Sequence, residues 1–169
     1  MTNTVQVHRV YIKATPERIW EAITKPEWTQ KYGYTGLADF DLEAGGKHRT
    51  RPTQAFIDAG FTGDLVDGEI LEVDPPRKLV ITWKLLMGPE VAAEPYTTLT
   101  YDIEETKTAG TRLTITHDLT GAPNTAALVS GQLEDVDAGP GENAGGGWAW
   151  VLSDLKSLLE TGEILVPAP

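Results

Sequence analysis

Cysteine is absent from the 169 residues of this chain. Without cysteine the chain has no disulfide bond, no thiol nucleophile and no thiolate metal ligand. The three histidines, His8, His48 and His117, form no HExxH motif and no tight metal-binding spacing. We therefore expect neither a metal ion nor a cofactor.

Long apolar runs and an excess of basic residues are lacking as well. No segment approaches the roughly 20 apolar residues that a membrane-spanning helix needs. The N-terminal stretch MTNTVQVHRV also lacks the basic start and the apolar centre of a secretion signal. With 14 Lys and Arg against 25 Asp and Glu, the net charge of −11 repels nucleic acid and anionic lipid. We expect a cytoplasmic protein with no nucleic-acid partner and no insertion into a membrane.

The content of apolar residues is ordinary for a globular protein, at 40%. The chain contains no internal repeat and no linker long enough to separate two domains, so we expect one domain over residues 1–169. No GxSxG turn surrounds a serine, and no glycine-rich phosphate loop is present. The sequence therefore offers no ready-made catalytic motif.

Alternation of apolar and polar residues predicts seven strands, of which the first covers residues 5–13. The stretch LADFDLEAGGKHRTRP predicts two strands joined near Gly45 and Gly46, because paired glycines supply the positive backbone angles of a tight turn. Two more hairpins are predicted, one over residues 67–85 and one over residues 97–119. In the last hairpin Leu99, Tyr101 and Ile103 face Leu113, Ile115 and His117.

Two short helices follow the first strand. The segment TPERIWEAIT carries a threonine N-cap and a proline at the first helical position, and KPEWTQKYG repeats the proline. The second segment places Trp28 and Tyr32 four residues apart on one helical face. Two other segments stay open: residues 53–63 fit a short helical turn or an inserted loop, and the acidic residues 121–147 are mostly loop with a helical segment near 125–133.

A long C-terminal helix begins near Gly147 and ends before Gly162. Its apolar stripe comprises Trp148, Val151, Leu152, Leu155, Leu158 and Leu159. Trp150 lies on the opposite side, near the surface unless a loop or another subunit covers it. The glycines before the helix let the chain enter it at a steep angle. Together these elements indicate an α+β protein in which the long helix covers one face of an antiparallel sheet.

Four stretches carry a family resemblance over nearly the whole chain: VYIKATPERIWEAITKPEWTQKY, DFDLEAGGKHR, GEILEVDPPRKLVITW and GWAWVLSDLKSLLETG. They resemble the START-like helix-grip (SRPBCC) superfamily and, within it, the homologues of the activator of the heat-shock chaperone ATPase. This resemblance implies a curved seven-stranded antiparallel sheet around the C-terminal helix. It also implies a cavity between them for small apolar or amphipathic molecules such as lipids or polyketides. The segment 53–63 and the acidic loop 121–147 depart from the family pattern and are expected at the cavity mouth.

Aromatic side chains are the first candidates for the cavity wall, because a large ring with one polar atom lines an apolar pocket and still offers a donor. With Leu152 from the helix stripe, this expected ligand-binding set comprises Trp28, Tyr32, Trp83, Tyr101 and Trp148. The alternative is a solid core without a pocket, and composition does not separate the two.

Arg49 is a further ligand-binding candidate. It shares one strand parity with Lys47 and Arg51, so the three side chains form a basic stripe. If the stripe faces inward, an arginine binds a ligand carboxylate through two parallel hydrogen bonds. If it faces outward, as unpaired basic residues favour, it is a solvated surface.

His117 and Glu69 are the two candidates for acid–base chemistry. His117 is in phase with Leu113 and Ile115 and faces inward, as a ligand-binding or catalytic residue or as a hydrogen-bonded histidine of the core. Glu69 is in phase with Leu71 and, if buried, has a raised pKa that suits a general base.

Three functions remain open from the sequence. The leading hypothesis is binding of a small apolar or amphipathic molecule in the cavity. The second is a cyclase-like or hydrolase-like enzyme that uses His117 or Glu69 in the same cavity. The third is a protein-interaction module that associates with a chaperone, or with a second copy as a homodimer, through Trp150 and the acidic loop.

Overall fold

A computed structural model describes residues 4–131 and 146–165 of the chain. Its strands form one seven-stranded antiparallel sheet in the order β1-β7-β6-β5-β4-β3-β2. The strands are β1 (Val5–Ile12), β2 (Leu37–Phe40), β3 (Lys47–Arg51), β4 (Val66–Asp74), β5 (Lys78–Leu85), β6 (Thr97–Glu105) and β7 (Thr111–Asp118). The helices are α1 (Pro16–Thr24), α2 (Pro26–Thr29), α3 (Gln54–Asp58), α4 (Pro89–Ala92), α5 (Pro123–Ser130) and α6 (Gly147–Thr161).

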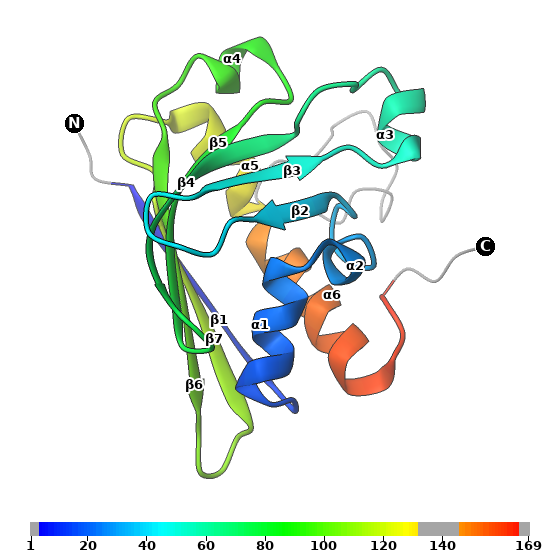
Figure 1. Cartoon of the computed structure of the whole chain (residues 1–169), viewed down its shortest axis with the longest axis vertical. Coiled ribbons are helices and arrows are strands. Elements are labelled where there is room, and N and C mark those ends of the chain that lie inside the picture. The colour runs from blue at the N-terminus through cyan, green and yellow to red at the C-terminus, as the bar shows by residue number, and fades with distance from the viewer. Residues whose placement is uncertain (1–3, 132–145, 166–169) are drawn as a thin grey trace.

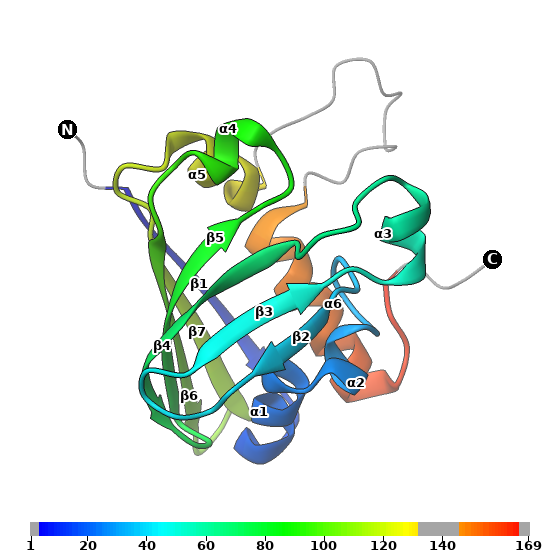
Figure 2. The ribbon, with the colours of Figure 1, turned by 45° about the horizontal axis from the view of Figure 1, so that its top comes forward.

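The sheet curves around the C-terminal helix. In Figure 1 and Figure 2, β1, β7, β6 and β5 form one wall, β4, β3 and β2 bend over toward α2, and α6 lies on the concave side beside α1. This arrangement confirms the predicted α+β class and the helix-grip fold, with two short helices between the first two strands.

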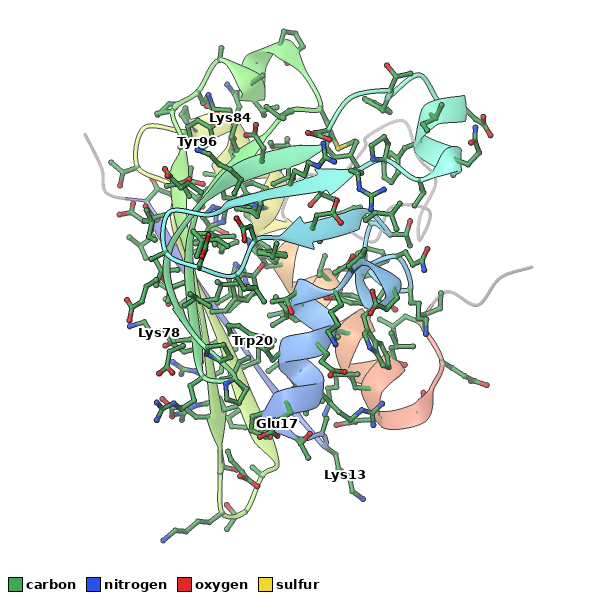
Figure 3. The ribbon with its side chains drawn as sticks, in the orientation of Figure 1. Lys13, Glu17, Trp20, Lys78, Lys84 and Tyr96 are labelled. Carbon is green, nitrogen blue, oxygen red and sulfur yellow. The ribbon has the colours of Figure 1, made fainter. Side chains whose placement is uncertain are left out.

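The predicted facing of the hairpins is confirmed residue by residue. Leu99 pairs with His117, Tyr101 with Ile115 and Ile103 with Leu113, all buried on the concave face. The alternate positions on these strands are threonine or charged residues and lie on the other face, as expected for a sheet with one solvent-exposed face. Figure 3 shows Lys78 and Lys84 of β5 on that outer side, whereas Trp20 of α1 points toward the concave face.

The first turn of α1 follows from its sequence. Thr15 accepts a hydrogen bond from the backbone N–H of Arg18 at 3.3 Å, and Pro16 occupies the first helical position, where no N–H is needed. The inner face of α1 buries Ile19 and Ile23 against the sheet core.

The glycines before α6 solve a steric problem at the start of that helix. Gly146 and Gly147 both have positive φ angles, +65° and +72°. A Cβ atom at residue 147 would lie 2.5 Å from the backbone nitrogen of Gly131 and 2.6 Å from the carbonyl oxygen of Val129. Only glycine combines this backbone angle with so close an approach, and the first turn of α6 therefore rests directly on the end of α5.

The segments left open by the sequence contain short helices. Residues 53–63 hold α3, and the helix predicted near 125–133 is α5, which begins at Pro123. Residues 132–145, most of the acidic loop, lie outside the described part of the chain. The short helix α4 was not predicted, and Glu94, two residues after its end, caps α5. The Glu94 carboxylate accepts hydrogen bonds from the backbone N–H groups of Asn124 and Thr125 at 2.8 Å each.

Within residues 4–131 and 146–165, no helix is long and apolar enough to cross a membrane.

A buried carboxylate ties α6 to two other segments. Asp154 is 3% exposed. Its Oδ2 accepts a hydrogen bond from the N–H of Gly33 at 2.8 Å, and its Oδ1 accepts one from the N–H of Leu165 at 2.8 Å. The loop after α2 and the chain after α6 are thereby fixed to the middle of the helix.

We predict that Asp154→Ala lowers the free energy of unfolding by about 1–3 kcal/mol, because it leaves the Gly33 N–H without its buried acceptor. Chemical denaturation checks this, with Ser153→Ala, an exposed neighbour, as the control that stays within about 0.5 kcal/mol of the wild type. Equal losses in the two variants would contradict the role assigned to Asp154.

Candidate functional site: a cavity beneath the C-terminal helix

A cavity of about 500 Å³ lies between α6 and the concave face of the sheet. Strands β2 to β7 contribute to its wall, as do α6, the chain between α2 and β2, Phe56 of α3, and Leu128 and Val129 of α5. The lining side chains are mainly aliphatic and aromatic, and none of them is an aspartate, glutamate, lysine or arginine. The cavity is thus an apolar space of the size that small molecules occupy in proteins.

Five of the eight predicted ligand-binding residues line this cavity. They are Tyr32, Trp83, Tyr101, Trp148 and Leu152. The other three, Trp28, Arg49 and His117, do not line it.

Trp28 lies outside the cavity because the helix that carries it is short. The sequence placed Trp28 and Tyr32 on one helical face, but α2 ends at Thr29, so the four-residue spacing does not put them side by side. The Trp28 ring is half-buried, with the Lys31 ammonium 4.6 Å and the Arg18 guanidinium 5.8 Å from its centroid. Trp28 therefore forms cation–π contacts on the surface.

Arg49 points outward. Its side chain is 56% exposed and lies 3.7 Å from Asp39 and 4.0 Å from Asp64. Arg51 forms the closest pair of the stripe, with Nε 2.5 Å from a carboxylate oxygen of Asp39, and this bond lowers the pKa of Asp39. Of the two alternatives for the basic stripe, the structure therefore shows the solvated surface, where neighbouring acidic side chains pair with its positive charges.

Glu69 is likewise outside the cavity, and a β-bulge explains the difference from the expected phase. The pairing of β4 with β5 shifts between Ile70 and Glu72, so Ile70 and Val73 both face inward although they are three positions apart. Glu69 therefore turns outward, where its carboxylate is 46% exposed and lies 3.8 Å from the ammonium of Lys47. An exposed, paired carboxylate lacks the burial that the general-base hypothesis required.

His117 sits behind the cavity wall with both ring nitrogens occupied. The indole N–H of Trp148 donates to His117 Nδ1 at 3.0 Å, and Nε2 lies 2.8 Å from the hydroxyl oxygen of Thr97. Because an indole nitrogen only donates, Nδ1 accepts and the proton is on Nε2. The Thr97 hydroxyl then donates to the carbonyl oxygen of Trp83 at 2.9 Å. This chain of bonds fixes one neutral tautomer of His117.

The surroundings of His117 strongly disfavour its charged form. Its side chain is 0% exposed, and the Trp83 and Trp148 rings lie 5.2 and 5.9 Å away, centroid to centroid. Burial is the main cause that lowers the pKa of His117 to about 4, with a smaller contribution from His8 in the same direction, while Asp118 opposes it. A buried ring with both nitrogens hydrogen-bonded matches the hydrogen-bonded core histidine that the sequence left open as an alternative.

His48 lines the cavity but was not among the predicted site residues. It is 3% exposed, it stacks on Phe40, and its Nε2 donates to the carbonyl oxygen of Thr82 at 2.6 Å. Burial lowers its pKa, so it is neutral near pH 7. A sequence signal existed, because a strand whose Lys47 and Arg49 face outward must turn the residue between them inward.

Two buried tyrosines line the cavity, and they differ in whether the hydroxyl has a hydrogen-bond partner. The Tyr32 hydroxyl donates to the carbonyl oxygen of Ala22 at 2.8 Å. The Tyr101 hydroxyl forms no hydrogen bond with the described residues, although Tyr101 is only 9% exposed. Burial raises the pKa of both phenols well above its usual range, so both are neutral.

A curved antiparallel sheet that holds a C-terminal helix over an apolar cavity defines a protein of the helix-grip class. Within this class, the chain belongs to the family described as Activator of Hsp90 ATPase homolog 1-like protein, whose sequence profile matches residues 13–160. The family resemblance read from the sequence is therefore confirmed. A comparison with curated proteins gave no match.

Solved structures share the fold at low sequence identity. Protein SSP2350 from Staphylococcus saprophyticus is 20% identical, with a TM-score of 0.62 and 98% of each chain covered. The Aha1 dimer from Colwellia psychrerythraea is 21% identical, with a TM-score of 0.59 over 95% of this chain and 98% of that one. Protein CV1439 from Chromobacterium violaceum is 21% identical, with a TM-score of 0.58 over 92% of this chain and 97% of that one.

We predict a loss of stability between about pH 6.5 and about pH 4 that depends on His117. The pKa of His117 is about 4 in the folded chain, against a reference of 6.5, so the unfolded chain takes up the proton first as the pH falls. The stabilisation is complete above the higher value and is lost toward the lower one, to the extent of about 3 kcal/mol. Denaturant unfolding across this pH range measures it.

The matched variant is His117→Gln, whose amide accepts from Trp148 and donates to Thr97 without titrating. We expect it to flatten the pH dependence between pH 6.5 and 4, while His8→Gln, at a less buried histidine, changes it much less. If His117→Gln keeps the full wild-type slope, His117 is not the titrating group.

Proposed function

We propose that this protein binds a small apolar or amphipathic molecule in the cavity beneath α6. The observation that carries the proposal is the cavity itself, about 500 Å³ in volume and lined by aliphatic and aromatic side chains. An apolar guest would replace poorly hydrogen-bonded water there, which favours binding without a large change in structure.

The family supports a ligand-binding or chaperone-associated role in general terms, and the interior of this chain favours the first. The enzyme hypothesis gains no support from its two candidate residues, because neither His117 nor Glu69 lines the cavity. Trp150, the candidate for a protein contact, packs against Tyr34 with ring centroids 5.3 Å apart, and is half-buried. That contact reduces the indole surface available to a partner.

We predict that N-phenyl-1-naphthylamine, a neutral fluorescent probe, binds this cavity and raises the melting temperature in proportion to the logarithm of its concentration. Ala38→Phe places a ring in the cavity, because Ala38 lines it and is 7% exposed. We expect this variant to weaken probe binding at least tenfold. The same substitution at the exposed Ala109 is the control and leaves binding unchanged. Absence of binding to the wild type, or equal binding to the Ala38→Phe variant, contradicts the proposal.

We also propose that the protein forms a homodimer along β1. Strand β1 is an edge of the sheet and pairs only with β7 among the described strands. Its outer side exposes Val5, Val7 and Tyr11 at 51%, 56% and 44%. Exposed apolar side chains on an edge strand favour pairing with a second chain, and the related protein from Colwellia psychrerythraea is described as a dimer.

We predict that sedimentation finds a dimer at micromolar concentration and that Val7→Lys shifts it to the monomer, because a lysine on an edge strand opposes pairing. Leu71→Lys is the control, since Leu71 is 49% exposed on β4, away from this edge. A wild-type monomer at every concentration, or identical behaviour of the two variants, would show that β1 is not an interface.

A further inference from the structure

Several polar side chains of the cavity wall already hydrogen-bond to the protein. The Thr29 hydroxyl donates to the carbonyl oxygen of Gly36 and accepts from the N–H of Ala38, at 2.8 and 3.0 Å. Tyr32 and His48 each donate to a backbone carbonyl group, as described above. A guest in the cavity therefore has few protein groups left with which to exchange a hydrogen bond.

Tyr101 is the deeply buried exception. It lies on β6 near the middle of the sheet, between Leu79 of β5 and Ile115 of β7. Among the described residues, every fully buried side-chain nitrogen or oxygen has a hydrogen-bond partner. The unpartnered Tyr101 hydroxyl is therefore not sealed in the core, and the accessible space beside it is the cavity that Tyr101 lines.

A free hydroxyl in an apolar cavity is unfavourable until a partner arrives. Burial of the hydroxyl costs it hydrogen bonds to water. A ligand oxygen in the cavity provides an acceptor that replaces such a bond. The phenol is neutral because burial raises its pKa, and a neutral phenol donates one hydrogen bond.

The absence of charged side chains from the described cavity wall narrows the class of ligand further. No lysine or arginine lines the cavity, and the one histidine that does, His48, is held neutral. Transfer of a carboxylate or phosphate into such a space is strongly opposed, because nothing there compensates the loss of its hydration.

We infer that the cavity takes a neutral ligand with an oxygen acceptor, such as a ketone, ester or ether, and that the Tyr101 hydroxyl donates to that oxygen. The inference rests on the proposed function and adds the chemical class of the ligand and the residue that orients it. The competing donors are the Thr50 hydroxyl and the Trp83 indole N–H, since both residues line the cavity, are half-buried and form no side-chain hydrogen bond with the described residues.

The test uses two compounds of equal chain length at pH 8, 2-undecanone and undecanoate, in displacement of bound N-phenyl-1-naphthylamine. We expect that displacing half of the bound probe takes at least a tenfold higher concentration of undecanoate than of the ketone. Tyr101→Phe should weaken the ketone roughly 3- to 10-fold, the effect of one hydrogen bond, and leave the affinity of the probe within about twofold. Its melting temperature should match the wild type, because no protein hydrogen bond is lost.

Tyr32→Phe is the matched control in the same cavity. It removes the bond to Ala22, so it should lower the melting temperature while the ratio of ketone to probe affinity stays unchanged. The inference is overturned if undecanoate competes as well as the ketone or if Tyr101→Phe binds both compounds like the wild type. It is also overturned if Thr50→Val or Trp83→Phe, and not Tyr101→Phe, selectively weakens the ketone. Failure of the probe itself to bind contradicts the proposed function and is distinct from these outcomes.

Discussion

The hydrogen bond from the Trp148 indole to Nδ1 of His117 is the contact on which the cavity depends. It joins the first turn of α6 to the concave face of β7, and it does so with two groups that are costly to bury alone. Since the indole can only donate, it selects one histidine tautomer, in which the Nε2–H of His117 donates to the hydroxyl oxygen of Thr97. The helix is thus docked by a directional bond as well as by apolar area.

Two further contacts keep α6 at its distance from the sheet. The start of the helix rests on the end of α5 through Gly147, and Asp154 fixes the loop at Gly33 to the middle of the helix. Leucines of the helix stripe fill the space toward α1 and β1. Because polar contacts hold the first two turns, side chains need not fill the space beneath them, and an apolar cavity remains there.

Periodic features of this fold were predictable from the sequence, and local exceptions were not. Strand alternation placed Tyr101 and His117 on the inner face, and the helical stripe separated Trp148 from Trp150 correctly. The bulge at Ile70 belongs to the pairing of β4 with β5 and reverses the phase expected for Glu69. The early end of α2 separated Trp28 from Tyr32. The cavity itself was not predictable from composition, because the same side chains can line a cavity or fill a solid core. The spacing between the helix and the sheet decides between the two.

The most direct test of this account is the ring protonation of His117, read from two-bond proton–nitrogen correlation spectra at pH 6 to 7. The account predicts a neutral ring with the proton on Nε2 and with Nδ1 as an unprotonated acceptor, and a shift of both nitrogen signals in Trp148→Phe. A proton on Nδ1, or a charged ring in this pH range, would contradict it, because the indole of Trp148 would then have no acceptor on which to dock the helix.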